Sequence, residues 1–160
     1  MMVKVLFVCL GNICRSPMAD GVFAHMVKEA GLADKIQVDS AGTGSWHVGE
    51  AAHPGTRKVL QEHQIEYDGR ARQFRLNDLE TVDYLLAMDR SNLSNIHKIA
   101  TGMKPVGEVR MFLSYANAAG MTDVEEVPDP YYTGGFDYVY DLVEKGSQAL
   151  LDHIRKENDL

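Results

Sequence analysis

The sequence predicts an α/β fold: a single-domain, open, mainly four-stranded parallel sheet with helices on both faces. Short runs rich in Val, Ile, Leu and aromatic residues alternate with segments whose apolar residues repeat at helical spacing. This alternation is typical of a parallel sheet with crossover helices. The chain has 160 residues and shows no internal repeat, low-complexity tract or linker, so residues 1–160 are expected to form one domain.

The first strand is expected at residues 3–8, because a nearly continuous apolar run is typical of a strand buried on both faces. A polar turn that contains glycine follows it. Ser16 followed by Pro17 is typical of a helix start, with Ser as the N-cap and Pro at the first helical position. Apolar residues then repeat at helical spacing as far as Gly31, the expected C-cap.

The remaining elements follow the same reasoning. Strands are expected at 36–40, 81–87 and 106–111, and helices are expected to begin at 53–55 and 88–93 and to cover 136–154. A loop rich in Gly, Pro and Asp precedes the last helix. In such sheets, ligands bind at the carboxyl ends of the strands. The first three strands bring Cys9, Ser40 and Asp89 to that edge.

The charge balance limits the classes of partner. The chain carries 16 Lys and Arg residues against 23 Asp and Glu residues, a formal charge of −7 at pH 7. Such a chain repels polyanions, so no nucleic-acid partner is expected. Its 45% of hydrophobic residues exclude disorder as the main state, yet no apolar run is long enough to span a membrane. The N-terminal residues do not resemble a signal peptide, so a soluble cytoplasmic domain without a membrane partner is expected.

The two cysteines exclude some classes of protein. Cys9 and Cys14 lie five residues apart near the N-terminus, whereas a secreted disulfide scaffold uses more cysteines and spreads them along the chain. A structural zinc site would need more ligands than this segment offers. Two roles remain for these cysteines, thiol chemistry and ordinary core packing. The residues of the surrounding loop distinguish the two.

The loop after the first strand carries the candidate chemistry. It comprises Cys9, Leu10, Gly11, Asn12, Ile13, Cys14, Arg15 and Ser16. Backbone N–H groups in a turn that leads into a helix form a cradle for a tetrahedral oxyanion. Gly11 lets the backbone curl tightly or take a positive φ. Arg15 can present a charged, bidentate fork to two phosphate oxygens.

A cysteine at the base of such a cradle is a candidate nucleophile. The N–H dipoles and Arg15 favour the thiolate of Cys9, and Ser16 can donate a hydrogen bond to the sulfur. A thiolate that faces a bound phosphate can form a cysteinyl-phosphate, which water then hydrolyses. No metal or cofactor is needed, because Arg15 and the amides neutralise the phosphate oxygens. An isolated cysteine is more often a buried core residue, but Cys-x5-Arg-Ser between a strand and a helix favours catalysis.

Five segments together resemble a known family. They are the loop 9–16, Ser-Ala-Gly-Thr at 40–43, Ala-Arg-Gln at 71–73, Met-Asp at 88–89 and Asp-Pro-Tyr-Tyr at 129–132. In this order and at this total length they are similar to the low-molecular-weight protein tyrosine phosphatases, over essentially the whole chain. Cys-x5-Arg-Ser alone is shared by several phosphatase folds. Its position at the extreme N-terminus and the late Asp-Pro-Tyr-Tyr make the resemblance specific.

The resemblance implies a role for each matching residue of the loop. Cys9 is similar to the family's nucleophile, Arg15 to its phosphate-binding arginine, and Ser16 to the hydroxyl that stabilises the thiolate. Asn12 resembles the asparagine that holds the loop in its strained shape, with the help of a serine that matches Ser40.

Further along the chain, Asp129 is similar to the general acid that protonates the leaving phenolate and later activates water. The aromatic walls that receive the tyrosine ring are matched by Trp46, Tyr131 and Tyr132. The implied substrate is therefore a phosphotyrosine protein or a small aryl phosphate. One departure is Gly69, where family members often carry a histidine bonded to the loop asparagine. The loop asparagine, Asn12, then has fewer hydrogen-bond partners behind it, or Arg70 or a water takes the place of the histidine.

Several of these residues also fit simpler interpretations. Asp129 lies between two prolines and is typical of a turn, and Asp89 is expected to cap the helix after it. Trp46 and His47 could plug a loop, but a role as a wall of the cleft is preferred. A thiol-dependent arsenate reductase shares the loop, but its relay normally uses three cysteines. A non-catalytic phosphate-binding module would need neither Cys9 nor Asp129. A protein tyrosine phosphatase is therefore predicted.

Cys14 is expected to make the activity redox-regulated. It lies within disulfide reach of Cys9 after a small backbone movement. A sulfenic acid formed on Cys9 by peroxide could then condense with Cys14 to a reducible disulfide. The alternative is that Cys14 packs in the core and never meets Cys9.

Overall fold

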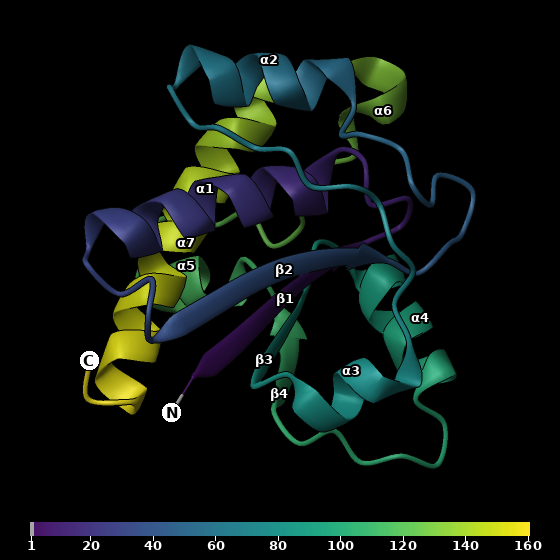
Figure 1. The fold of residues 1–160 in the computed structure, drawn as a ribbon, viewed down its shortest axis with the longest axis vertical. Helices are drawn as coiled ribbons and strands as arrows, with labels where there is room; N and C mark the ends of the chain where they lie inside the picture. The colour runs from purple at the N-terminus through teal and green to yellow at the C-terminus, as the bar shows by residue number, and fades with distance from the viewer. Residues whose placement is uncertain (1) are drawn as a thin grey trace.

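A computed structural model, which describes residues 2–160, contains one four-stranded sheet in which all strands are parallel (Figure 1). The strands lie in the order β2-β1-β3-β4. Their bounds are β1 Val3–Cys9, β2 Ile36–Gly42, β3 Tyr84–Ala87 and β4 Glu108–Met111. The predicted α/β class with a parallel sheet is confirmed.

Helices cover both faces of the sheet, as predicted (Figure 1). Their bounds are α1 Arg15–Glu29, α2 Pro54–Glu62, α3 Leu76–Thr81, α4 Arg90–Ile99, α5 Ser114–Ala118, α6 Pro130–Thr133 and α7 Phe136–Glu157. The core on one face is shared by α1, α2, α5 and α7, and the core on the other face by α3 and α4. Among the described residues, no helix has the length and apolarity needed to cross a membrane.

The central strand β1 explains why its sequence is apolar throughout. Val5 and Phe7 belong to the core that includes α1 and α7, whereas Leu6 and Val8 belong to the opposite core. Phe7 also packs edge-on against Phe23 of α1, with ring centroids 5.8 Å apart. Each such buried side chain contributes about 1.5–3 kcal/mol, so the strand that carries Cys9 at its end is held firmly.

The start of α1 corrects one prediction. The helix begins at Arg15 and its N-cap position is Cys14, which makes no side-chain capping bond. Ser16 was expected to be the N-cap, but it lies within the first turn, as does Pro17. Proline is tolerated in the first turn because the N–H groups there lack helical partners anyway. The Ser16 hydroxyl is therefore not used as a cap. The end of the helix is as expected: Gly31 follows it with a φ of 72°.

Other boundaries shift by a few residues. The predicted strand at 81–87 begins only at Tyr84, because residues 76–81 form the short helix α3. The predicted strand at 106–111 begins at Glu108, and β2 runs two residues beyond the predicted Ser40. The segment expected as a loop before the last helix contains the short helices α5 and α6.

Candidate active site

The loop between β1 and α1 is held in shape from below. The left-handed residue of this loop is Asn12, with a φ of 57°; Gly11 does not take the positive φ that was one of the two expectations for it. Asparagine tolerates this conformation better than most residues. The loop crosses directly over Gly42 at the end of β2, where an added Cβ would lie 2.7 Å from the carbonyl oxygen of Leu10. The N–H of Thr43 donates to the carbonyl of Cys9 at 3.0 Å.

Three side chains link the Cys9 sulfur to β2. The Sγ atom of Cys9 lies 3.0 Å from Oγ of Ser16. The side-chain amide of Asn12 donates to Oγ of Ser16 at 2.8 Å and to Oγ of Ser40 at 3.0 Å. Its carbonyl oxygen accepts from the N–H of Arg72 at 2.9 Å. The two serine hydroxyls and both polar atoms of the Asn12 side chain are therefore used to fix the loop and the Cys9 sulfur.

Beneath Ser40 the network continues into the half-buried carboxyl of Asp20. The hydroxyls of Ser40 and Tyr67 donate to Oδ2 of Asp20 at 3.2 and 3.0 Å. Burial raises the pKa of Asp20 to about 6 and raises the pKa of the Tyr67 phenol above its usual range. A Cβ at Gly69 would lie 2.4 Å from the Tyr67 phenol oxygen. Tyr67 therefore fills the space that a side chain at Gly69 would use and extends the network below Ser40, whereas Arg70 donates to the carbonyl of Gly49 and does not reach Asn12.

Arg15 is a buried cation whose guanidinium is fixed at one nitrogen, Nη1. Its Nη1 atom donates to Oδ2 of Asp89 at 2.6 Å and to the carbonyl of Val127 at 3.0 Å. Its Nη2 atom lies 3.6 Å from Oδ2 of Asp129. Burial opposes the charge, but Cys9 and the two carboxylates outweigh it and raise the pKa of Arg15. Asp89 also caps α4 by accepting from the N–H of Asn92 at 2.7 Å, as predicted.

Asp129 lies beside Arg15, at the start of α6. It is the N-cap of α6, where Oδ1 accepts from the N–H of Tyr131 at 3.0 Å while Oδ2 faces Arg15. The expected turn is therefore present, and the same carboxyl lines the cavity that contains Cys9. Its side chain is 35% exposed, so solvent can exchange protons with it.

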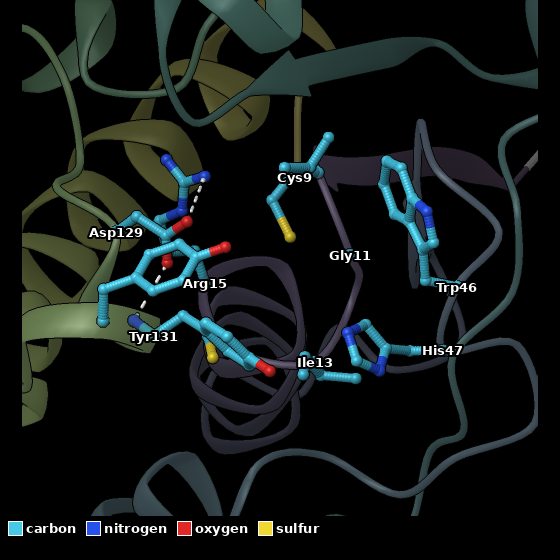
Figure 2. Close-up of a pocket in the computed structure, with 11 residues that line it drawn as sticks. Cys9, Gly11, Ile13, Arg15, Trp46, His47, Asp129 and Tyr131 are labelled. Atoms are coloured by element: carbon cyan, nitrogen blue, oxygen red, sulfur yellow. Dashed lines mark hydrogen bonds and ion pairs between the residues drawn. The ribbon is translucent and has the colours of Figure 1, made fainter.

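The cavity above Cys9 has a volume of about 360 Å³. Its lining comprises Cys9, Leu10, Gly11, Ile13, Cys14, Arg15, Trp46, His47, Asp129, Tyr131 and Tyr132. Figure 2 shows the Cys9 sulfur between two walls: Arg15, Asp129 and Tyr131 lie on one side, and Trp46 and His47 lie on the other. Such a slot can accept a flat ring with a phosphate at its base.

The aromatic walls differ in how far they are exposed. Tyr131 stands between two histidine rings, with centroids 6.1 Å from His47 and 5.9 Å from His53. Trp46 and Tyr132 form the outer rim and are 70% and 84% exposed. The Trp46 ring lies against Gly44, where an added Cβ would overlap it. Because Trp46 is 70% exposed, it does not plug the loop; it lines the outer rim of the cavity.

The structure thus brings the predicted residues to one end of the sheet. Asn12 and Ser16, within the loop, and Ser40, at the end of β2, bond to one another through their side chains, and the other predicted residues line the cavity. The link from Asp89 to Arg15 was missed, although the expected position of Asp89 at the same sheet edge pointed to it. His47, which was considered with Trp46 as a loop plug or a cleft wall, lines the cavity. Asp20 lies one helical turn after Ser16, which is the one sequence signal for its place in the network. Tyr67 had none.

The two cysteines differ in environment. Both are buried and both line the cavity. Burial, reinforced by the nearby Cys9 and Asp129, raises the pKa of the Cys14 thiol to about 12. Cys14 therefore stays a neutral thiol at physiological pH. Within residues 2–160, no group of three or more His, Cys, Asp or Glu side chains is arranged to hold a metal ion.

Comparisons with known proteins agree with this geometry. Residues 4–160 match the family model described as low molecular weight phosphotyrosine protein phosphatase. The chain is 44% identical over 160 residues to low molecular weight protein-tyrosine-phosphatase YfkJ of Bacillus subtilis, covering 99% of this chain and 100% of the relative. It is 43% identical to the phosphatase PtpA of Staphylococcus aureus, covering 99% of this chain and 98% of that one.

Solved structures give the same result. The crystal structure of YfkJ from Bacillus subtilis superposes with a TM-score of 0.93 at 43% identity, covering 99% of this chain and 98% of that chain. The crystal structure of a Drosophila arginine phosphatase superposes with a TM-score of 0.87 at 32% identity, covering 96% and 98%.

Proposed function

The chain belongs to the low molecular weight phosphotyrosine protein phosphatase family and is a protein-tyrosine-phosphatase, and from that premise we propose that Cys9 is its nucleophile and Asp129 its general acid. The observation that carries this proposal is that one small cavity is lined by a buried cysteine, a buried arginine and a carboxyl. A phosphate there would meet an attacking sulfur, a cation and a proton donor together.

In the first step the Sγ thiolate of Cys9 attacks phosphorus, and the bond from phosphorus to the phenolic oxygen breaks. Protonated Asp129 gives its proton to that oxygen, so the tyrosine leaves as a neutral phenol. The Arg15 fork and the loop N–H groups bind the equatorial oxygens and stabilise the charge of the transition state. Asp89 and the Val127 carbonyl hold Nη1 of Arg15, which leaves the remaining N–H groups of the fork for the phosphate.

In the second step water attacks the cysteinyl-phosphate. Asp129, now a carboxylate, takes a proton from this water, the bond from sulfur to phosphorus breaks, and inorganic phosphate leaves. The Cys9 thiolate is regenerated. Ser16, 3.0 Å from the sulfur, donates a hydrogen bond that stabilises the thiolate as the leaving group.

The depth of the cavity supports a preference for aryl phosphates. Trp46, Tyr131 and Tyr132 line the cavity whose floor is Cys9 (Figure 2), and a phenyl ring packed against these aromatic side chains brings its phosphate to the floor. A phosphoserine side chain is shorter and lacks a ring for these walls to contact. The proposed substrates are therefore phosphotyrosine proteins or small aryl phosphates, not nucleic acids or membrane lipids. The proposed location is the cytoplasm, where reducing conditions keep the Cys9 thiol active.

The test is metal-free hydrolysis of phenyl phosphate and of matched phosphopeptides. Wild type should hydrolyse phenyl phosphate in EDTA, and Cys9→Ser should be inactive. Arg15→Lys should also fail, because an ammonium group cannot replace the bidentate fork. Full activity of Cys9→Ser, or a strict requirement for Mg²⁺, would overturn the proposed mechanism.

Substrate class needs its own comparison, because one structural relative is an arginine phosphatase. Phosphotyrosine, phosphoserine and phosphoarginine peptides of otherwise identical sequence separate the possibilities. We expect kcat/KM to be highest for phosphotyrosine, because the cavity walls are aromatic. A higher kcat/KM for phosphoarginine would contradict the aryl preference while leaving the cysteine mechanism intact.

A further inference from the structure

An open groove adjoins the active-site cavity on the side of α2. It shares Ile13, His47 and Tyr131 with that cavity, and its remaining lining comes from residues 49–54 together with Arg57 and Arg70. A substrate whose phosphate reaches Cys9 therefore passes this groove as it leaves the cavity. Two arginines beside the entrance stand out in a chain of net charge −7.

Backbone carbonyls orient both arginines. Nε of Arg57 donates to the carbonyl of Ala52 at 3.0 Å, and Nη1 of Arg70 donates to the carbonyl of Gly49 at 3.3 Å. The accepting segment is itself fixed. Gly49 donates its N–H to the carbonyl of Ala71 at 2.8 Å, and Ala71 donates back to Glu50 at 2.9 Å. The two side chains are thus anchored at the groove with donors to spare, since a guanidinium carries five N–H groups.

Neither arginine has an acidic partner within the described part of the chain. The ion pairs formed by residues 2–160 include neither Arg57 nor Arg70. The groove contains one carboxylate, Glu50, which is paired with His47 at 3.0 Å. Glu66 and Asp68 line a separate hollow on the other side of Arg57. The groove itself therefore presents two cations with unused hydrogen-bonding capacity.

We propose that Arg57 and Arg70 form a subsite for an acidic side chain that flanks the phosphotyrosine of the substrate. This inference rests on the proposed function, because it assumes a phosphotyrosine held above Cys9. Carboxylates of Asp or Glu match the planar forks of both arginines. The active-site cavity selects the aryl phosphate, and the groove selects among phosphotyrosine sequences.

The experiment compares kcat/KM for phosphotyrosine peptides that carry either Glu or Gln at the positions flanking the phosphotyrosine. One exposed ion pair changes an equilibrium by up to about fivefold, so for two arginines we expect wild type to prefer the Glu peptides about 5- to 10-fold. The double variant Arg57→Gln/Arg70→Gln should reduce this ratio to about one. The preference of wild type should also shrink as salt increases, since exposed charges are screened.

The matched control is Arg155→Gln. Arg155 is another exposed arginine whose Nε donates to a backbone carbonyl, that of Leu160 at 3.4 Å. It lies near the C-terminal end of α7, outside the groove and the cavity. This variant should keep the full preference for Glu peptides. A charge reversal, Arg57→Glu/Arg70→Glu, should make peptides with flanking Lys the better substrates.

Equal kcat/KM for Glu and Gln peptides in wild type, or an unchanged preference in the double variant, would overturn the subsite. Hydrolysis of p-nitrophenyl phosphate separates this failure from failure of the proposed function, since that substrate has no flanking side chain. If wild type and the double variant both hydrolyse it through Cys9 but show no peptide preference, only the subsite is wrong. If wild type does not hydrolyse it, the proposed function is wrong as well.

Discussion

The phenol oxygen of Tyr67 lies 3.0 Å from Oδ2 of Asp20, on the far side of Ser40 from the phosphate-binding loop. From this pair a chain of hydrogen bonds runs through Ser40, Asn12 and Ser16 to the sulfur of Cys9. A partly buried carboxyl and a partly buried phenol thus support Cys9, the proposed nucleophile, through two intervening layers of side chains.

The Tyr67–Asp20 pair makes stability depend on pH. Burial raises the pKa of Asp20 to about 6, against about 3.9 for an ordinary Asp, so the folded protein holds this proton more tightly than the unfolded chain does. The resulting stabilisation is full below about pH 4 and is lost as pH rises through about 6. Relative to Asp20→Asn, the free energy of unfolding of wild type should fall by up to about 3 kcal/mol between these limits.

Urea unfolding of both proteins at several pH values measures this difference. Asp34→Asn, at an exposed aspartate after α1, serves as the control and should follow wild type. Tyr67→Phe should lower kcat several-fold with little change in KM, because it loosens the support of the loop without touching substrate. An identical pH dependence for wild type and Asp20→Asn would show that Asp20 titrates normally.

Asp89 is expected to matter more for Arg15 than for its helix. Asp89→Asn keeps an N-cap acceptor for α4 but removes the charge 2.6 Å from Nη1 of Arg15. Removing one partner of a buried ion pair costs about 3–5 kcal/mol, whereas losing a cap costs about 1 kcal/mol. Asp89→Asn should therefore cause most of the destabilisation seen in Asp89→Ala, and should raise KM because the fork is no longer held. If Asp89→Asn is as stable and active as wild type, Asp89 acts only as a cap.

Asp129→Asn should lower kcat for phenyl phosphate by about 10²- to 10⁴-fold, the usual contribution of a positioned general acid. The loss should be smaller for p-nitrophenyl phosphate, because its leaving group is already a stable anion. The basic limb of the pH profile should disappear, since that limb reports the loss of the proton on the acid.

Asp123→Asn is the matched control for this prediction. Asp123 is an exposed carboxylate in the same connection between α5 and α6, and its variant should behave as wild type. A wild-type rate for Asp129→Asn on phenyl phosphate would mean that another residue is the acid.

Gly42 should be intolerant of any side chain. The Cβ of Gly42→Ala would lie 2.7 Å from the carbonyl oxygen of Leu10 and 3.0 Å from the N–H of Asn12. The loop between β1 and α1 must therefore move. We expect a loss of about 1–3 kcal/mol in the free energy of unfolding together with a higher KM for phosphate esters. Gly11→Ala is the comparison, because its Cβ would meet only side chains, the nearest atom being in the His47 ring at 3.1 Å. Equal effects of the two variants would show that this close backbone contact has no special role.

The strands and the main helices could be predicted from local sequence because each depends on its own apolar pattern. β1 is recognisable from its continuous apolar run, and α1 from its apolar repeat. Ser16 was assigned wrongly as a cap for the same reason: Ser-Pro is a local signal, while the actual partners of Ser16 are Cys9, Asn12 and the carbonyl of Ala41. The hydroxyl of Ser16 forms these tertiary hydrogen bonds and does not cap the helix.

The loop that carries the proposed nucleophile could be predicted because its candidate residues lie within eight consecutive positions, 9–16. Residues that join the site from far along the chain could not be predicted in the same way. Tyr67 reaches Asp20 across 47 positions of the chain, and a tyrosine two residues before a glycine carries no local signal. Asp129 was identified through the family resemblance, since its flanking prolines indicate only a turn.

Cys14 should protect Cys9 from irreversible oxidation. Peroxide should oxidise Cys9 first, because the pKa of Cys14 is raised to about 12 and its thiol stays neutral, whereas the proposed nucleophile reacts as a thiolate. Peroxide transfers one oxygen to Cys9 and leaves as water; the sulfenic acid then condenses with the Cys14 thiol, releasing a second water and forming a disulfide. Both cysteines line the same cavity, so a small backbone movement brings the sulfurs together.

The measurement is peroxide inactivation followed by dithiothreitol, with intact mass recorded at each stage. Wild type should lose about two daltons, the two thiol hydrogens of a disulfide, and then regain activity. Cys14→Ser should gain oxygen mass and recover poorly, because sulfinic and sulfonic acids are not reduced by thiols. Inorganic phosphate bound above Cys9 should slow inactivation of both proteins, which checks that the oxidation occurs in the cavity. If Cys14→Ser recovers as fully as wild type, Cys14 has a packing role only.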